Sequence, residues 1–297
     1  MTHQQALRKL LSDMQLRGLS ENTVKSYSFP IMQFLNQCCK TDVMSLDEKD
    51  FRQHLLHLHN QGTLKPATIN RYNSAIRFFY EVTLEKDINY KRVPHAKQHK
   101  IRPEVLSVPE LISFFDEINN PRHFAFYLNL YGSGLRISEM LSLQTGDIDG
   151  KRMLLHIRNG KGGKERFTPL TDAGYTALRY YWRKYSPVNA HNYVFPDYTR
   201  TRTLSKAALE SMFKKVSKEA GLGKAVTPHT LRHSFSTHSL QSGMDLMTLK
   251  EMLGHTSLSS TSVYLHLSLI DQSNKRSPSG VTSEIKSLFD ERNFIHG

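Results

Sequence analysis

One arginine near the middle of the chain stands where its side chain can bind an anion. Arg136 lies near the start of the helical pattern of residues 134–143, just after a flexible, glycine-containing segment, residues 131–134. A guanidinium at this place can reach a ligand beside a helix N-terminus. An arginine in a first helical turn is by itself more often a surface or salt-bridge residue, so its companions decide the interpretation.

A second helix start carries further side chains that suit the same chemistry. A proline fitted to the first turn of a helix precedes His229 and Arg232, which stand three residues apart on one helix face. Both can therefore address one phosphate. Further along, Gly254 breaks a helical pattern so that His255 can turn back toward the same site, and Tyr264 follows nine residues later.

The histidines of this region also raise the question of a metal site. His229, His233 and His238 recur at four and five residues. However, the sequence holds no HExxH motif and no carboxylate or thiol partner at ligand spacing. We therefore expect no metal, and interpret His233 and His238 as packing or capping residues.

Residues 152–170 predict a β-hairpin, because apolar and polar residues alternate on both sides of a glycine-rich turn. The turn, residues 160–164, reads GKGGK and superficially suggests a phosphate-binding loop. It lacks the Walker spacing and leads into a strand instead of a helix, so we expect no nucleotide cofactor.

The composition points to a polyanionic partner. The 297 residues include 40 Lys and Arg against 27 Asp and Glu, a formal charge of +13, which suits DNA, RNA or an anionic membrane. No apolar run approaches the roughly 20 residues that span a bilayer, and the start lacks a signal-peptide core, so we expect a cytoplasmic protein without membrane contact. Cys38 and Cys39 are neighbours and predict no disulfide framework.

The first part of the chain predicts a bundle of about four helices. From residue 6 to about residue 85, apolar residues recur at three and four positions. The segment 45–48 has the pattern of a capping box, with Ser45 at the N-cap, and Pro66 suits the first turn of the fourth helix. Pro30 is expected to kink or end the second helix.

Several basic residues of this part are candidates for DNA contact. Arg71 and Arg77 lie six apart on the fourth helix and point to roughly opposite faces, so we expect one of them to contact DNA and the other to be solvated or ion-paired. The linker, residues 90–103, holds many bases and two prolines. Lys97 and Lys100 within it either contact phosphates or belong to a solvated tether.

These patterns predict a mainly α-helical protein with a small antiparallel β-sheet, an α+β fold. We expect a helical domain at residues 1–90, whose basic residues suit DNA binding, and a basic linker at 91–104. A second, mixed domain at 105–283, which holds the residues suited to chemistry, and a C-terminal tail at 284–297 follow.

Five segments, in this order and at these intervals, resemble the tyrosine recombinase family of phage integrases, Xer-type recombinases and integron integrases. They are GLRISEMLSL (134–143), GKGGKER (160–166), HTLRHSF (229–235), LGH (253–255) and TSVYLH (261–266). Residues 20–27 and 66–80 also resemble the core-binding domain of this family. Each motif alone is unspecific, but the ordered set is specific.

The resemblance implies a site-specific DNA recombinase that works through a 3′-phosphotyrosyl intermediate. The catalytic residues it implies are Arg136, Lys161, His229, Arg232, His255 and Tyr264. Lys161 is preferred over Lys164 by the resemblance alone, and Lys164 is the alternative acid or a DNA contact.

The expected chemistry explains these residue types. Two guanidiniums suit the charge that builds on phosphate oxygens. Tyr264 needs help to lose its proton, because a free phenol has a pKa near 10, and His229 is the residue expected to help. Lys161 would protonate the leaving 5′-oxygen, and His255 would donate a hydrogen bond to the phosphate.

No metal or other cofactor is expected, since cations of the chain carry the charge and the phosphotyrosyl bond stores the energy for rejoining. The implied partners are double-stranded recombination sites and further copies of the chain. Four protomers would pair two duplexes, and residues 284–294 would link neighbours.

Two alternatives to recombination remain at this point. A type IB topoisomerase-like enzyme uses the same phosphotyrosine chemistry without pairing two duplexes. A catalytically silent DNA-binding architectural protein would keep the fold alone. The separate N-terminal helical domain favours recombination over the first, and the intact set of six residues argues against the second.

Overall fold

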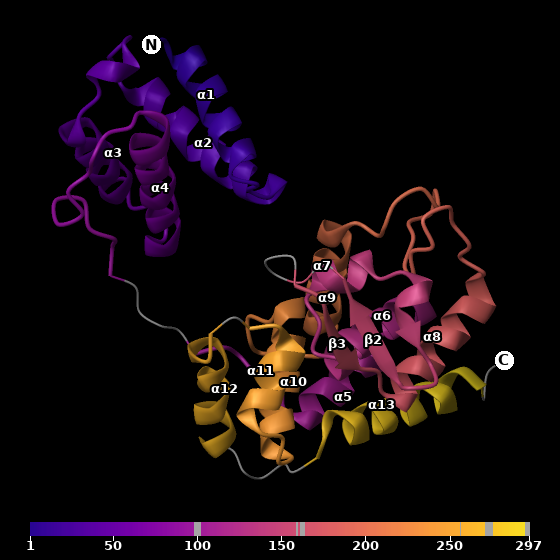
Figure 1. The fold of residues 1–297 in the computed structure, drawn as a ribbon. Helices are drawn as coiled ribbons and strands as arrows, with labels where there is room; N and C mark the ends of the chain where they lie inside the picture. The colour runs from indigo at the N-terminus through magenta and orange to yellow at the C-terminus, as the bar shows by residue number, and fades with distance from the viewer. Residues whose placement is uncertain (98–101, 159, 161–163, 256, 271–275, 295–297) are drawn as a thin grey trace. The chain divides into compact units, whose positions relative to one another are not determined.

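The computed structural model describes residues 1–97, 102–158, 160, 164–255, 257–270 and 276–294. It contains two compact units, residues 1–101 and 102–297 (Figure 1). Each unit has its own buried apolar cluster. The mainly helical class with a small antiparallel sheet is confirmed. No helix in the described part of the chain is both long and apolar enough to cross a bilayer.

The N-terminal unit is the expected bundle of helices. Its α-helices are α1 (His3–Leu16), α2 (Glu21–Gln37), α3 (Glu48–Asn60) and α4 (Pro66–Phe78), with the short helices η1 (Val43–Ser45) and η2 (Phe79–Thr83). Pro30 does not end α2, which continues for seven more residues. Phe34 and Leu35 beyond it are buried in the unit's core, and this packing holds the rest of the helix in place.

The capping residues of α3 differ from those the sequence predicted. Asp47, and not Ser45, is the N-cap: its carboxylate accepts hydrogen bonds from the backbone N–H groups of Lys49 and Asp50. The Asp50 carboxylate in turn accepts one from the Asp47 backbone. Ser45 lies in η1. An aspartate two residues further on completes the same reciprocal box, so the sequence offered two registers.

The C-terminal unit packs helices around two buried ones. Its elements are α5 (Val108–Asp116), α6 (Pro121–Gly132), α7 (Ile137–Ser142), η3 (Thr145–Asp147), β1 (Ile148–Asp149), β2 (Leu154–Ile157), β3 (Arg166–Pro169), α8 (Asp172–Tyr185), α9 (Lys206–Glu219), α10 (Pro228–Gln241), α11 (Leu246–Leu253), α12 (Ser259–Ile270) and α13 (Pro278–Phe294). Helices α6 and α10 are buried along most of their length and contact each other. They form the support for the surrounding elements.

The predicted hairpin is confirmed. Strands β2 and β3 pair antiparallel, with Leu154 opposite Pro169 and Ile157 opposite Arg166, and β1 pairs with the other edge of β2. Strand β3 contacts α11. The hairpin turn therefore extends from strands that are fixed to the helical part of the unit.

Helix α13 packs on its own unit. Val281, Ile285 and Phe289, spaced four apart, are buried, and α13 contacts α5, α6 and α8. Its range includes residue 284, where the sequence predicted the start of a separate tail. The spacing of four places all three side chains on one stripe, which the unit's own apolar surface covers.

Replacing Phe289 by leucine is expected to destabilise the C-terminal unit modestly. The Phe289 ring stacks on Phe124 with centroids 3.8 Å apart and an interplanar angle of 20°. Leucine retains much of the apolar volume but loses the ring pair, worth about 0.5–1.5 kcal/mol beyond area burial. Chemical denaturation would measure the change. An unchanged free energy of unfolding would mean that the docked α13 adds little to stability.

Candidate active site

Arg136 lies at the N-cap of α7, as its place in the sequence predicted. Its Nη1 donates to Oε1 of Glu139 at 2.7 Å, and its backbone N–H donates to Oε2 at 2.8 Å. About a fifth of the side chain remains exposed. The guanidinium is thus held by one carboxylate and is still accessible to a ligand.

Glu139 is the centre of the site's charge network. Arg166 donates two hydrogen bonds to the carboxylate, Nη1 to Oε1 at 2.9 Å and Nη2 to Oε2 at 2.8 Å. The Nη1 of Arg232 lies 3.8 Å from Oε2. Burial alone would raise the pKa of Glu139, but the hydrogen bonds and charge of Arg166, with those of Arg136, hold that pKa at about 2. One ionised carboxylate therefore orients three guanidiniums.

Arg232 is buried in α10 and is positioned by main-chain oxygens. Its Nη1 donates to the carbonyl of Gly134 at 2.7 Å, and its Nη2 donates to the carbonyl of Leu253 at 2.6 Å. Burial and the charge of Arg136 lower the pKa of Arg232 to about 9, which leaves it charged at neutral pH. These bonds join α10 to the segment before α7 and to the end of α11.

Gly254 ends α11 and brings His255 to Arg232. Its φ of 62° is a left-handed conformation that glycine adopts without strain. The Nε2 of His255 lies 3.1 Å from Nη2 of Arg232, and its Nδ1 lies 3.0 Å from Oγ1 of Thr261. Burial, followed by the charge of Arg232, lowers the pKa of His255 to about 4, so the ring is neutral.

Tyr264 on α12 is buried, with 4% of its surface exposed, and its hydroxyl has a histidine partner. That partner is Nδ1 of His233, 2.8 Å away. Burial raises the pKa of Tyr264, while Arg232, Ser236 and Arg136 act in the opposite direction. The interpretation of His233 as a packing or capping residue is therefore wrong, because the ring contacts the expected nucleophile.

His229 stands one ring further from Tyr264. Its ring centroid is 4.5 Å from that of His233, at an interplanar angle of 82°. The side chain is exposed at the surface, although neighbouring protein atoms still reduce its hydration. That loss of hydration, with the charges of Arg232 and Arg136, lowers the pKa of His229. His229 belongs to the cluster, but the ring nitrogen that contacts the Tyr264 hydroxyl is that of His233, and Ser236 also hydrogen-bonds that hydroxyl.

The other residues singled out from the sequence are spread over both units. Lys161 and Lys100 lie outside the described residues. Lys164, before β3, is exposed, as are Arg71 on α4 and Lys97. Arg77 instead turns inward: its Nη2 donates to the carbonyl of Val93, and its guanidinium lies 4.3 Å from the centroid of the Tyr90 ring. Of the two arginines on α4, Arg71 is exposed, and Arg77 is partly exposed and bound to its own unit.

Arg166 is a site residue that the sequence reasoning missed. Besides Glu139, it bonds through Nε to the carbonyl of Met252 at 2.7 Å, and its side chain is only 9% exposed. The available signal was the strand alternation, which places Arg166 on the same face as the buried Thr168. Arg166 thus ties the hairpin to α7 and to the end of α11.

Replacing Arg166 by lysine is expected to slow DNA cleavage about tenfold to a hundredfold, a barrier change of about 1.4–2.7 kcal/mol. Lysine keeps the charge but cannot make the two parallel bonds to Glu139 and the bond to Met252 together. Single-turnover cleavage is the measurement. Arg158→Lys is the matched control. Arg158 directly follows β2 of the same hairpin and pairs with Asp147 of η3. Equal rates for both variants would refute this role.

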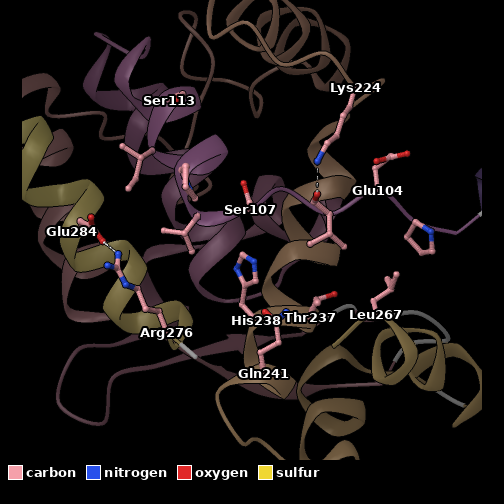
Figure 2. A pocket seen from close by; sticks show the side chains of 15 residues that line it. Glu104, Ser107, Ser113, Lys224, Thr237, His238, Gln241, Leu267, Arg276 and Glu284 are labelled. Carbon is pink, nitrogen blue, oxygen red and sulfur yellow. Dashed lines mark hydrogen bonds and ion pairs between the residues drawn. The ribbon is translucent and has the colours of Figure 1, made fainter. Parts of the chain in front are cut away.

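The largest pocket described lies elsewhere in the unit. Its volume is about 990 Å³, and it is lined by the start of α5, the end of α10, α12 and α13 (Figure 2). Lys224 and Glu110 pair near it, and Arg276 pairs with Glu284. His238 on its wall bonds Tyr131. None of the active-site candidates lines this pocket. Among the described residues, no group of His, Cys, Asp or Glu is arranged to hold a metal ion.

Two family models match the chain. Residues 104–269, more than half of the sequence, match the phage integrase family. Residues 7–90 match the N-terminal SAM-like domain of phage integrases.

Named relatives cover most of the chain. A putative integrase/recombinase of Sinorhizobium fredii is 34% identical over 261 residues, 88% of this chain and 83% of that protein. The tyrosine recombinase XerD of Halalkalibacterium halodurans is 31% identical over 84% of this chain and 89% of that protein. Among solved structures, a lambda integrase dimer bound to a core site has a TM-score of 0.71 at 17% identity, covering 93% of this chain and 98% of that one, and supports the fold. The chain therefore belongs to the phage integrase family of tyrosine recombinases.

Proposed function

We propose that this chain performs site-specific DNA recombination with Arg136, Lys161, His229, Arg232, His255 and Tyr264 as its catalytic residues. The observation that carries the proposal is the convergence of four elements at one place. The start of α7, the helix α10, the end of α11 and α12 bring these groups together: Arg136 and Arg232 lie at Glu139, His255 lies at Arg232, and Tyr264 bonds the neighbour of Arg232, His233. This set matches the needs of a phosphodiester attack.

The two arginines bind the phosphate that is cut. Attack on a phosphodiester builds negative charge on the non-bridging oxygens, and guanidiniums placed beforehand stabilise that charge without reorganising. Arg136 is fixed by Glu139, and Arg232 by two carbonyls. His255 adds a third polar group beside the Arg232 guanidinium.

Tyr264 is the nucleophile and Lys161 the acid of the reaction. The Tyr264 oxygen forms a bond to phosphorus while the bond to the 5′-oxygen breaks, and Lys161 on the hairpin turn supplies the proton to that oxygen. The product is a 3′-phosphotyrosine and a free 5′-hydroxyl. Because the phosphodiester energy is kept in the new bond, a 5′-hydroxyl can reverse the reaction without ATP.

The partners of this reaction are recombination sites in double-stranded DNA and further copies of the chain. Four protomers pair two duplexes and exchange strands. Residues 284–294 link neighbours in this assembly by leaving the packing of α13 on its own unit. A cytoplasmic location is part of the proposal and is supported by the bacterial recombinases among the relatives. No observation favours a type IB topoisomerase-like enzyme or a silent architectural protein, and the relatives are named as recombinases.

Covalent capture with the wild-type chain tests the proposal. A duplex from the DNA flanking the gene, nicked near the suspected cut, traps the cleaved state because the released fragment diffuses away. We expect an adduct on the 3′-phosphate in the presence of EDTA. In a second reaction, with two duplexes that carry the same site without a nick, we expect strand exchange. Binding without an adduct on several sites would favour the architectural protein, and relaxation without exchange would favour the topoisomerase.

A basic surface next to the site is expected to bind the DNA backbone. Lys214 and Lys218 on α9 are exposed and line a shallow pocket with Thr227 and Pro228, the start of α10. Their replacement by alanine should weaken binding to all sequences alike and reduce the salt dependence of log K by about two, one unit for each phosphate contact. Titrations at several salt concentrations measure the slope. Lys184→Ala on α8 is the control and should leave it unchanged.

A further inference from the structure

The hydroxyl of Tyr264 is joined to His233, which the family resemblance does not place among the catalytic residues. The distance from Nδ1 to the hydroxyl oxygen is 2.8 Å, and the ring centroids lie 5.5 Å apart at 43°. His233 is half-buried in α10, one residue after Arg232. The Tyr264 hydroxyl therefore shares a hydrogen bond with a ring nitrogen of the residue after Arg232, besides its hydrogen bond with Ser236.

We propose that His233 is the general base that takes the proton of Tyr264 during DNA cleavage. The inference rests on Tyr264 being the nucleophile, as proposed above. As the Tyr264 oxygen bonds to phosphorus, its proton moves to Nδ1 of His233, and the departing 5′-oxygen takes a proton from Lys161. In rejoining, the 5′-hydroxyl attacks and returns its proton to Lys161, and the Tyr264 oxygen leaves and recovers its proton from His233. Each direction moves one proton at each oxygen, so the steps balance.

The surroundings of His233 keep its acceptor available. Burial, with His229 and Arg232 on α10 and His255 after α11, lowers the pKa of His233 to about 4. The ring is therefore neutral at pH 7, and a neutral imidazole with its proton on Nε2 presents a lone pair at Nδ1. A protonated ring would have no acceptor for the Tyr264 hydroxyl.

Bound DNA strengthens this base. Besides burial, three groups lower the pKa of His233: the guanidinium of Arg232 and the rings of His229 and His255. All three lie at the proposed phosphate-binding site. A phosphodiester bound at Arg232 brings a negative charge next to these groups, which offsets their effect and favours a protonated His233. The proton acceptor is thus weak in the free protein and becomes effective when substrate is in place.

The geometry assigns a different role to His229. Its ring meets His233 nearly edge-on at 4.5 Å and is exposed at the surface. From there it can contact the phosphate, while His233 stands between it and Tyr264 as the direct proton acceptor. The expectation that His229 receives the tyrosine proton is replaced by this assignment.

The first test is single-turnover cleavage of the nicked duplex by His233→Asn. Asparagine keeps an oxygen acceptor near the Nδ1 position but cannot take a proton. We expect the cleavage rate to fall about a hundredfold or more, the usual range for loss of a general base, with DNA affinity unchanged. His238→Asn is the matched control, since His238 on the same helix bonds the Tyr131 hydroxyl through Nδ1 at 2.9 Å, away from the site. That variant should cleave at the wild-type rate.

The second test separates proton transfer from positioning. A fluorinated tyrosine at position 264 has a lower phenol pKa and needs less help from a base. If His233 accepts the proton, the loss caused by His233→Asn shrinks to less than about tenfold with the fluorinated nucleophile, because the intrinsic demand for base catalysis falls. Comparing two nucleophiles within one variant also removes any effect of that variant on folding.

The outcomes are distinct. Cleavage by His233→Asn within about threefold of wild type, or an equal loss with both nucleophiles, overturns the role of His233 and leaves the recombinase proposal intact. If wild-type protein forms no adduct, both proposals fall. A large loss that the fluorinated tyrosine reduces, with His238→Asn unaffected, establishes His233 as the base.

Discussion

Replacing Tyr264 by phenylalanine is expected to abolish the covalent adduct, because phenylalanine has no hydroxyl to attack the phosphate. Cleavage should be at least about ten-thousandfold slower than in the wild type. DNA binding should persist, because the ring stays in its buried position on α12. The lost hydroxyl leaves Nδ1 of His233 without this partner, at a cost of about 1 kcal/mol in stability. Denaturing gels of trapped complexes and parallel DNA titrations measure both effects.

Tyr131→Phe is the matched control for this experiment. Tyr131 is also buried and also bonds a histidine of α10, His238, so its variant loses the same kind of hydrogen bond. It should be destabilised to a similar degree and still form the adduct. An adduct formed by Tyr264→Phe would show that another residue attacks the phosphate.

Replacing Glu139 by glutamine is expected to cost about 3–5 kcal/mol of stability, the usual loss when one partner of a buried ion pair is removed. The neutral amide cannot offset Arg136, Arg166 and Arg232, whose charges then repel one another in a buried setting. The arginines also lose the group that orients them, so cleavage should fall with stability. Denaturant unfolding and single-turnover cleavage at a temperature where the variant is folded measure the two losses.

The effect of Glu139→Gln should depend on pH in a defined direction. The folded-state pKa of Glu139 is about 2, below its ordinary value of 4.5. A depressed carboxyl pKa contributes stability that is fully present above the unfolded value and is lost as the pH falls toward the folded one. The difference in unfolding free energy between wild type and variant should therefore be largest near neutral pH and narrow between about pH 4.5 and about pH 2.

Asp147→Asn provides the comparison for Glu139. Asp147 is another buried carboxylate of the unit, but it pairs with the half-exposed Arg158, outside the arginine cluster. Its loss should leave the cleavage rate of the folded protein unchanged. A Glu139→Gln variant within about 1 kcal/mol of wild type would mean that the three guanidiniums do not depend on this carboxylate.

Local patterns in the sequence were sufficient for the N-terminal helices and for the hairpin. The alternation in residues 152–170 predicted β2 and β3, and the spacing of apolar residues predicted the N-terminal helices. Both signals depend only on which face of an element is covered. Where two local solutions compete, as at Ser45 and Asp47, the same kind of signal failed, since either residue can cap a helix.

The positions of the expected catalytic side chains followed from ordered motifs. Arg136, Arg232, His255 and Tyr264 come together in the structure, as the resemblance implied. Lys161 lies outside the described residues and remains a prediction, as do the exposed Arg71, Lys97 and Lys164 as DNA contacts. Arg77 donates a hydrogen bond to the Val93 carbonyl and lies over the Tyr90 ring. The spacing of residues along α4 does not predict these two contacts.

The sequence by itself determined the elements, the charge of the chain and the residue types available for phosphate chemistry. The tertiary structure alone decided which atoms meet. His233 reaches Tyr264 across 31 positions, and Arg166 reaches Glu139 across 27 and Met252 across 86. Such contacts depend on how α10, α12 and the hairpin cross. The periodicity of apolar residues indicates only which face of each element is buried. Many packing angles between two elements bury the same faces, so the sequence pattern does not tell which side chains meet.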